Sequence, residues 1–591
     1  MGGTMRGTVV HGFGIAALNF VLCAVPASAE ATPTVVEALG KIALRDPRGA
    51  ERVLSPAERS AVVVVFLGTE CPLVKLYTLR LNELAARFAT RNVELVGVDS
   101  NQQDSLEEIH EFVRRQNATF PILKDPDHKL ADLLYARRTP EAFVIDSRGE
   151  IRYRGRIDDQ YGVGFLRPTP TRKDLEVAVE EVLAGKDVSV AETEAQGCII
   201  GRAKRVVRSE DVTYTRDVAK IFNDRCVRCH RPGEIGPFPM TRYEEVVGWA
   251  DTIREVIDQG RMPPWFADPH YGDFLDDPRL SDDEKATIAR WVDNGCPKGD
   301  DADLPPPPSY VDGWQMETPP DLVFAMADKP FQVPAEGSVD YVYYEIDPKW
   351  DEDKWIYGSE ARPGNRAVVH HILVFCKRPG KWYPPGLPGE LISAYAPGMK
   401  QTVGADKSMA ALLPKGSKIV MQMHYTPNGV PQEDLSYFGL KFADPADIEW
   451  EIKPGMAINF LFRIPPRDPN YRVPAMFTFG EDSLLLGVNP HMHLRGKSFL
   501  YEALYPNGRR ETLMSCPKFD FNWQIGYQYR NPIPMPKGTK MICTAYFDNS
   551  EGNLSNPDPN QTVRFGEQTW DEMMIGWFYY AVKRDESLAA K

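Results

Sequence analysis

The stretch AVVVVFLGTECP, residues 61–72, carries the clearest structural signal in this chain. Its β-branched run over residues 61–66 predicts a buried strand, because branched side chains pack well on a pleated surface and none here is polar. A helical pattern begins at Leu73 and continues to Phe88. Cys71 is therefore expected at the N-terminus of a helix, where the helix dipole lowers the pKa of a thiol and favours the thiolate.

The alternation of strands and helices continues after this stretch, and Pro140 stands just before a late strand. This order, with a Cys after the first strand and a Pro before a late one, resembles the thioredoxin-like redoxin and peroxiredoxin superfamily. The resemblance implies an α/β thioredoxin-like domain over residues 30–205. The further elements expected in it are strands at 93–98, 142–146 and 151–157 and helices at 106–115 and 174–184.

The role of Cys71 stays open between a redox-active thiol and an inert or disulfide-bonded thiol of a retained scaffold. Position 74 is Val74, so dithiol exchange within one Cys-x-x-Cys motif is excluded. Peroxiredoxins place a Thr three residues before their reactive Cys, whereas Thr69 stands two before Cys71. Within this region, Cys198 is the one candidate for a resolving partner.

The composition narrows the class of protein. A length of 591 residues suggests about four domains. The net charge of −14, without a basic cluster, argues against nucleic-acid binding, because phosphate recognition needs grouped Lys and Arg.

The first 29 residues have the pattern of an export signal. Arg6 supplies the positive start, residues 15–25 an apolar run, and Ala27-Ser28-Ala29 a small-residue cleavage site. The apolar run is too short to span a bilayer. We therefore expect a periplasmic or secreted protein, cut after Ala29, with no membrane span after removal of the signal.

The sequence Cys226-Val227-Arg228-Cys229-His230 has the spacing of a c-type haem attachment site. Two thiols at this spacing can add to the porphyrin vinyl groups while the adjacent imidazole binds the iron. A zinc site would need a second ligand pair, and none follows, which leaves a disulfide loop as the alternative. Helical patterns surround the motif. We expect a small all-α cytochrome c domain over residues 212–304 with one haem c per chain.

Met262 is the preferred sixth ligand of this haem. It stands in the loop Gly260-Arg261-Met262-Pro263-Pro264-Trp265, after a helical pattern, and a thioether ligand there would raise the haem potential. Met240 and His270 are its competitors. The linker expected at residues 305–312 begins with four prolines, which makes it stiff.

From residue 313 to residue 583 the pattern changes to short β-runs separated by Pro, Gly, Asn and Asp. Pro427-Asn428-Gly429 and Pro506-Asn507-Gly508 predict hairpin turns. Two all-β antiparallel sandwiches, over residues 313–450 and 451–583, would account for this length. The clearest expected strands are 341–346, 368–375, 419–425 and 484–488.

Metal-binding side chains recur in this region. In a strand, side chains at i and i+2 share a face, so His491 and His493 can bind one ion. Adjacent His370 and His371 would point to opposite faces, so both can reach one ion only at a bulge or a strand end. Imidazole suits copper, and thioether sulfur favours Cu(I). The segments concerned are His370-His371, Gln422-Met423-His424-Tyr425, His491-Met492-His493 and Asp571-Glu572-Met573.

These segments, in this order, resemble the copper type II, ascorbate-dependent monooxygenases, the family of peptidylglycine- and dopamine β-hydroxylating enzymes. The resemblance covers nearly half of the chain and implies two coppers. One, which stores an electron, would be held by His370, His371 and His424. The other, which meets O2 and substrate, would be held by His491, His493 and Met573, with Met574 as the rival to Met573.

Three positions depart from the peptide-amidating members of that family. Those enzymes carry an Arg before the His-x-His pair and an Asn and a Tyr after the copper-binding Met. Here these positions are Asn489, Ile575 and Trp577. The groups that hold a peptide carboxylate are therefore missing, and we do not expect a C-terminal glycine peptide as substrate.

The combined expectation is an exported monooxygenase that inserts one oxygen atom of O2 into a C–H bond of a small organic molecule. His491, His493 and Met573 would be its catalytic residues. An external donor, either an ascorbate-like reductant or a redox protein, would supply electrons through the haem. The alternatives are a non-enzymatic copper-binding or electron-transfer protein, and a thiol peroxidase that uses Cys71.

Overall fold

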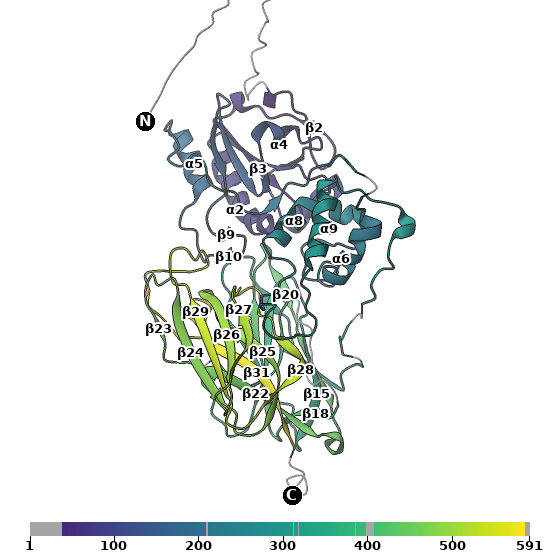
Figure 1. The fold of residues 1–591 in the computed structure, drawn as a ribbon. Coiled ribbons are helices and arrows are strands. Elements are labelled where there is room, and N and C mark those ends of the chain that lie inside the picture. The colour runs from purple at the N-terminus through teal and green to yellow at the C-terminus, as the bar shows by residue number, and fades with distance from the viewer. Residues whose placement is uncertain are drawn as a thin grey trace, which may run out of the picture.

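The computed structural model describes residues 38–208, 211–310, 313–316, 318–384, 386–397 and 407–584. The expected signal segment, residues 1–29, lies outside these ranges. Figure 1 shows three parts: an α/β domain (residues 38–201), a helical domain beside it (residues 211–304) and a β-rich half below both (residues 318–584). No helix in the described part combines the length and the apolar character that crossing a membrane requires.

The α/β domain is built on a mixed seven-stranded sheet in the order β2-β1-β5-β4-β3-β7-β8. Strand β3 (Ala61–Leu67) lies inside it, parallel to β4 and antiparallel to β7. Val63 and Val65 face one core, and Val62 and Val64 face another. The run is apolar throughout because it is covered on both faces. The remaining strands are β1 (Leu44–Arg45), β2 (Glu51–Arg52), β4 (Val93–Asp99), β5 (Ile122–Lys124), β7 (Glu141–Asp146) and β8 (Ile151–Gly155).

Helices cover both faces of this sheet. Residues of α2 (Pro72–Ala89), α3 (Leu106–Arg115) and α5 (Asp174–Leu183) share one core with Val63, and residues of α4 (Lys129–Leu134) share the other with Val62. The strands and helices expected between residues 61 and 184 are therefore confirmed. Two short pairs complete the domain: the hairpin β9 (Tyr161–Gly162) with β10 (Phe165–Leu166), and β6 (Arg138–Thr139) with β11 (Cys198–Ile199).

The helical domain packs around Phe222 and Trp291, both fully buried. Ser281 and Glu284 form a capping box: Glu284 accepts a hydrogen bond from the Ser281 backbone N–H at 2.7 Å, and Ser281 Oγ accepts one from the Glu284 backbone N–H at 3.1 Å. Its elements are a π-helical turn (Tyr214–Val218), α6 (Ala219–Arg225), α7 (Tyr243–Val246), a 3-10 turn (Val247–Trp249), α8 (Ala250–Asp258), α9 (Asp282–Asp293) and a 3-10 turn (Asp301–Asp303).

The β-rich half contains two packed cores, but they are not two separate antiparallel sandwiches. One eight-stranded sheet, in the order β12-β21-β15-β18-β22-β31-β25-β28, runs through both. It is continuous because β18 (Met409–Leu413) pairs in parallel with β22 (Trp450–Ile458). The expectation of purely antiparallel, separate sheets is therefore wrong at this junction. The other strands of this sheet are β12 (Leu322–Ala325), β21 (Tyr437–Phe442), β15 (Lys354–Arg362), β31 (Ile575–Lys583), β25 (Ser483–His491) and β28 (Tyr527–Met535).

Two four-stranded sheets cover the two ends of the long sheet. Ile372 and Met421 of one share a core with Phe438, and Phe499 and Met541 of the other share a core with Leu485. The first sheet contains β14 (Val342–Ile346), β19 (Lys418–Tyr425), β16 (Val369–Lys377) and β17 (Glu390–Tyr395); the second contains β24 (Tyr471–Thr478), β29 (Lys540–Phe547), β26 (Gly496–Leu504) and β27 (Arg510–Cys516).

One of the two predicted hairpins is confirmed. The turn at residues 506–508 joins β26 to β27, which pair directly, with Gly508 at φ +86°. The turn at residues 427–429 does not form a hairpin. Strand β19 is already paired on both edges, with β14 and β16, so the next strand, β20 (Gln432–Asp434), pairs instead with β13 (Phe331–Val333).

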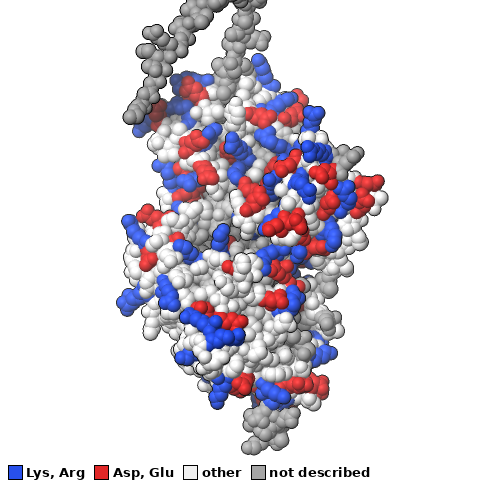
Figure 2. Space-filling model, in the orientation of Figure 1, with Lys and Arg blue, Asp and Glu red and all other residues white. Residues whose placement is uncertain are grey.

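Charged side chains of both signs mix on the face of the molecule drawn in Figure 2. No broad basic patch is visible among the described residues of that face. On this face, opposite charges therefore lie close enough to screen one another at short range.

Candidate functional site

The first imidazole group forms where β16 and β19 lie side by side. His371 is the cross-strand partner of His424, and the register shifts between Val369 and His371. That irregularity is the bulge that two adjacent histidines require, and it brings His370 to the same place. One potential ligand atom from each of the three side chains lies within 4.8 Å of the others. The structure thus joins the residues expected to form the first copper site.

Burial sets the charge of this group. It lowers the pKa of His370 to about 4, and it lowers the pKa of His371 and His424 well below the usual value. All three rings are therefore neutral near pH 7, the form that binds metals. His370 Nε2 and His424 Nδ1 are buried and have no hydrogen-bond partner among the described residues. Such orphaned imidazole nitrogens fit a bound copper ion.

The second group stands at the end of β25. The ring centroids of His491 and His493 are 5.2 Å apart, with perpendicular planes. Burial lowers the pKa of His491 to about 4 and keeps the pKa of His493 well below its usual value. Both side chains are therefore neutral, the form that binds metals, and their rings lie close together, as expected from their i, i+2 spacing.

Strand register favours Met573 over Met574 as the third member of this group. His491 is the cross-strand partner of Ile575, so the two side chains lie on one face of the sheet. Two residues earlier than Ile575, Met573 shares that face and belongs to the same buried cluster, whereas Met574 packs into the opposite core.

Two polar side chains that the sequence did not single out hold this second group. Gln524 Oε1 lies 2.8 Å from His491 Nδ1, which leaves Nε2 of that ring for a metal. Glu572 accepts hydrogen bonds from the backbone N–H of His493 at 2.8 Å and of Arg495 at 2.6 Å. Burial raises the pKa of Glu572 to about 8 despite these bonds. Its place beside Met573 was the only sequence signal for this role.

The two imidazole groups are neighbours. Phe521 stacks on His370 with ring centroids 5.5 Å apart, and its ring lies 6.1 Å from that of His493. His371 and His491 also line one small cavity of 20 Å³. No motif pointed to Phe521, because it becomes a bridge only once the two cores are packed together.

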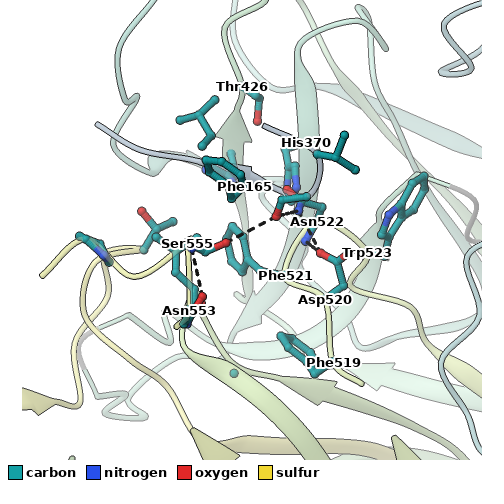
Figure 3. Close-up of a pocket in the computed structure, with 18 of the residues that line it drawn as sticks. Phe165, His370, Thr426, Phe519, Asp520, Phe521, Asn522, Trp523, Asn553 and Ser555 are labelled. Atoms are coloured by element: carbon teal, nitrogen blue, oxygen red, sulfur yellow. Dashed lines mark hydrogen bonds between the residues drawn. The ribbon is translucent and has the colours of Figure 1, made fainter. Parts of the chain in front are cut away.

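A chamber of 640 Å³ opens beside these groups, and all three parts of the chain line it. Figure 3 shows Phe165 of the α/β domain close to His370, with Phe521 and Asn522 beside them. Met262 of the helical domain lines it too. A volume of this size suits a small organic ligand, for which about 300–1,000 Å³ is usual.

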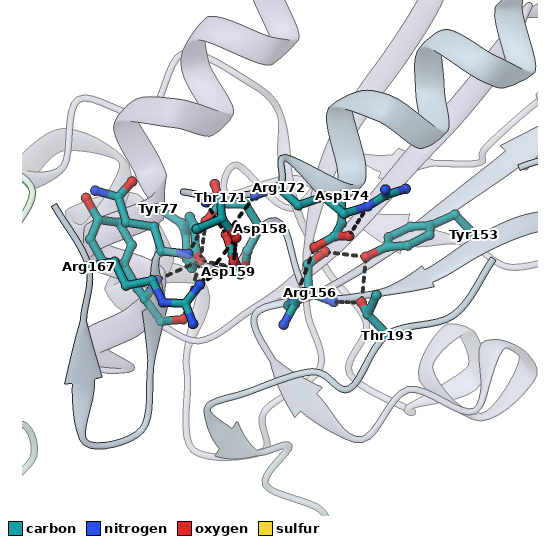
Figure 4. A network of polar contacts seen from close by, with 12 residues as sticks. Tyr77, Tyr153, Arg156, Asp158, Asp159, Arg167, Thr171, Arg172, Asp174 and Thr193 are labelled. Carbon is teal, nitrogen blue, oxygen red and sulfur yellow. Dashed lines mark hydrogen bonds and ion pairs between the residues drawn. The ribbon is translucent and has the colours of Figure 1, made fainter. Parts of the chain in front are cut away.

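The β9–β10 hairpin reaches the chamber because buried carboxylates hold the chain around it (Figure 4). Asp158 accepts a hydrogen bond from Tyr77 at 2.8 Å, and Asp159 accepts backbone bonds from Thr171 and Arg172 at 2.7 and 3.0 Å. The hairpin tip then contacts the β-rich half, where Asn522 donates to Gly164 O at 3.4 Å.

The haem-type motif lies between α6 and α7. Cys226 and Cys229 are free, half-buried thiols, and His230 Nδ1 lies 3.0 Å from Phe238 O. A ring whose Nδ1 donates to a carbonyl presents Nε2 to a metal, so these residues fit a covalent haem. Burial lowers the pKa of His230, so the ring is neutral.

The sixth-ligand prediction remains a prediction. Met262 is half-buried and lines the chamber rather than the core of the helical domain. Its competitor Met240 is buried in that core with Phe238. The other competitor, His270, is 81% exposed and hydrogen-bonded to Asp268, which makes it the poorest candidate.

The motif is joined to the first imidazole group by one ion pair. Glu234, four residues after His230, lies 2.7 Å from Arg366. Arg366 stands four residues before His370, and its guanidinium lies 5.9 Å from the ring centroid of Tyr395. Tyr395 lines the small cavity that contains His371. The linker at residues 305–312 is therefore not the sole connection between the two parts.

Cys71 is the N-cap of α2, as expected, and its thiol donates to Thr139 O at 3.0 Å. Burial acts to raise its pKa, but hydrogen bonds from Cys198, the Val74 backbone and Thr139 outweigh it and lower the pKa to about 6. The structure therefore brings Cys71 and Cys198 together, although they are far apart in sequence.

Comparisons with known proteins bear on the α/β domain. The AhpC/TSA family model matches residues 36–154. The thiol-disulfide oxidoreductase ResA of Bacillus subtilis (strain 168) is 28% identical over 109 residues, which are 18% of this chain and 59% of ResA. The match thus spans less than two thirds of that relative.

Two solved structures also show a local likeness. A hypothetical protein of Sinorhizobium meliloti 1021 is 31% identical, over 27% of this chain and 88% of its own, with a TM-score of 0.25. A secreted Mycobacterium tuberculosis disulfide oxidoreductase homologous to E. coli DsbE is 21% identical, over 20% of this chain and 82% of its own, with a TM-score of 0.18. The family match and the sheet order identify the α/β domain as a thioredoxin-like redoxin domain.

Proposed function

We propose that the chain is an exported copper-dependent monooxygenase that hydroxylates a C–H bond of a small organic molecule with O2. One observation carries this proposal: two neighbouring groups of buried, neutral imidazoles, whose members at His370 and His424 have ring nitrogens without a partner among the described residues. An unsatisfied buried nitrogen costs roughly 1–3 kcal/mol, which a bound metal would offset.

In the proposed arrangement, His370, His371 and His424 hold one copper, and His491, His493 and Met573 hold the other. Bound copper would supply one-electron redox chemistry and reactivity toward O2. Gln524 orients the His491 ring, and Glu572 fixes the backbone that carries His493. The overall reaction converts R–H, O2, two electrons and two protons into R–OH and H2O.

The chamber supports a small substrate of mixed character. Aromatic rings, such as those of Phe519 and Trp523, provide apolar walls, and Asn522 and Thr426 provide hydrogen-bonding groups. Asn489 and Trp577 line the small cavity beside His371 and His491. Neither side chain can pair with a carboxylate as an Arg would, which supports a substrate other than a peptide C-terminus.

Electrons are proposed to enter through a covalent haem on Cys226, Cys229 and His230, supplied by an external reductant or redox protein. The Glu234–Arg366 ion pair supports this route, because it holds the motif against the loop that leads into His370. A tethered and docked donor makes electron transfer intramolecular, at an effective concentration that reaches millimolar for short linkers.

The test begins with metal and haem analysis of purified protein loaded anaerobically with Cu(I). We expect two coppers and one haem per chain. We also expect O2 uptake that requires both copper and a substrate that the protein hydroxylates. Replacing His491 with Ala should remove one copper and abolish O2 uptake while the haem spectrum is unchanged. His110→Ala is the matched control, since His110 occupies an exposed position of α3.

Other outcomes would identify the alternatives. Zinc in stoichiometric amount with no copper after loading would overturn the copper assignment. If two coppers bind but the reduced protein takes up no O2 with any candidate substrate, the result would favour a copper-binding or electron-transfer protein. Peroxide consumption that disappears in Cys71→Ser would favour a thiol peroxidase.

A further inference from the structure

We propose that Cys71 and Cys198 form a reversible disulfide. In this proposal the linker strand β11 is the substrate of the redoxin domain within the same chain. The site joins two parts of the chain, because Cys198 belongs to the segment that leads to the helical domain. The proposal concerns residues remote from both imidazole groups, so it stands or falls independently of the copper assignment.

The strand pairing sets the two sulfurs side by side. Strand β11 pairs antiparallel with β6, which places Cys198 directly opposite Thr139. Thr139 O also accepts the hydrogen bond of the Cys71 thiol at 3.0 Å. The two thiols therefore flank one residue, and their side chains hydrogen-bond to each other. Side chains that lie this close meet the first requirement for a disulfide, whereas sulfurs on diverging side chains could not be joined.

The segment that carries Cys198 is seated closely on the redoxin domain. A Cβ at Gly197 would lie 2.0 Å from Thr139 O, and Gly197 has φ +133°, so only glycine fits there. Arg138 donates to Gly197 O at 2.8 Å. Further along, Gly201 N donates to Asn101 Oδ1 at 3.0 Å. The linker is thus held at several points on either side of Cys198.

This seating decides which partner Cys71 can have. Cys71 has no exposed surface, and Cys198 of β11 packs against the core to which Cys71 belongs. An external protein strand cannot pair with β6 while β11 occupies that edge. Cys198, by contrast, is partly exposed. A small thiol or disulfide from solution would therefore meet Cys198 first, and Cys71 would act only on Cys198.

The chemistry balances with a low-molecular-weight disulfide, RSSR, as oxidant. Cys198 attacks RSSR while its proton passes to the neighbouring Cys71 thiolate, and a mixed disulfide forms. The released RS− takes that proton from Cys71 and leaves as RSH. The Cys71 thiolate then attacks the Cys198 sulfur, forms the Cys71–Cys198 bond and releases the second RSH. In the reverse direction an external thiol attacks Cys198, and Cys71 leaves readily because a low pKa makes a good leaving group.

The disulfide would also reach the helical domain. Ile199 N donates to Thr252 Oγ1 on α8 at 3.0 Å, and Arg138 pairs with Glu255 of α8 at 2.7 Å. Glu255 also pairs with Arg261 at 3.0 Å, and Arg261 lines the chamber. Disulfide formation would link this segment covalently to the redoxin domain. It would thereby stabilise the part of the chamber wall that contains Arg261.

The test uses the full-length protein, equilibrated anaerobically in buffers of reduced and oxidised glutathione. The protein is then unfolded in acid and denaturant, its free thiols are alkylated with a mass-tagged agent, and the labelled positions are mapped by peptide mass spectrometry. As the buffer becomes more oxidising, we expect Cys71 and Cys198 to lose labelling together in one transition. A linked peptide pair, two hydrogens lighter than the two free peptides, should appear at the same time. Cys376 and Cys543 should remain labelled throughout. Independent loss at the two positions, or no loss across the whole range, would overturn the proposal.

Two variants sharpen the result. Gly197→Ala should lower the equilibrium constant for disulfide formation at least about tenfold, because the strand can no longer sit on Thr139. Gly480→Ala is the matched control, since a Cβ there meets nothing within 4 Å. In Cys198→Ser, Cys71 should form no intramolecular disulfide. A bridge from Cys71 to a different cysteine would also contradict the proposal.

Discussion

Replacing Gln524 with Leu should weaken copper binding at one site and leave the other intact. Gln524 Oε1 accepts a hydrogen bond from His491 Nδ1 at 2.8 Å, and the glutamine side chain is only 7% exposed. Leu fills a similar volume but cannot accept that bond, so the ring loses its fixed tautomer and orientation. Loss of such a partner typically costs about 10–100-fold in metal affinity.

That range corresponds to about 1.4–2.8 kcal/mol of binding free energy. The value agrees with the roughly 1–3 kcal/mol expected when a buried hydrogen-bonding group loses its partner. The assay is an anaerobic competition titration of Cu(I) against a chromophoric chelator. One of two equivalents should move to weaker binding, and the equivalent held by the first imidazole group should keep its affinity.

Two further variants make the titration decisive. Gln332→Leu is the control, because Gln332 donates only to Glu433 on the exposed surface. Gln524→Glu retains an acceptor and should keep most of the affinity. If both equivalents in folded Gln524→Leu bind as in the unchanged protein, the reasoning that places His491 in a copper site through this bond is refuted.

Three other predictions address the relay, the thiol and the methionine. Arg366→Met should slow haem-to-copper electron transfer up to about tenfold without making it concentration-dependent, because one docking contact is lost; stopped-flow reoxidation of the reduced haem measures this. The closure of the Cys71–Cys198 disulfide from glutathione-capped Cys198 should speed up with pH through the Cys71 pKa of about 6 and then level off, because the thiolate attacks. Cys516, whose burial raises its pKa to about 12, should form no mixed disulfide at any pH below that, and acid-quenched mass spectrometry follows both thiols. Met573→Leu should lower Cu(I) affinity at one site by about tenfold while Met574→Leu leaves it unchanged, and chelator competition on both variants compares them.

The sequence predicted the long strands and helices of the redoxin domain to within two residues of their ends, but not the short β1, β2, β5 and α4. The run at residues 61–66 predicted a buried strand, and Cys71 was expected at the start of a helix, as found. These signals are local, since periodicity, capping and β-branching act within one element. The His-His and His-x-His pairs were visible for the same reason, and strand geometry even implied the bulge beside His370 that is now found.

Contacts between elements could not be predicted in this way. Phe521 between the two imidazole groups and Gln524 behind His491 depend on segments that are distant in sequence. For Cys71 the sequence offered Cys198 as a candidate partner, but not the strand pairing that brings it there. Residues 427–429 show the limit clearly: their turn signal was strong, but β19 had no free edge for a hairpin partner. Sequence patterns specify which groups a strand offers, whereas register and domain packing decide which of them meet, because those depend on the pairing of whole sheets.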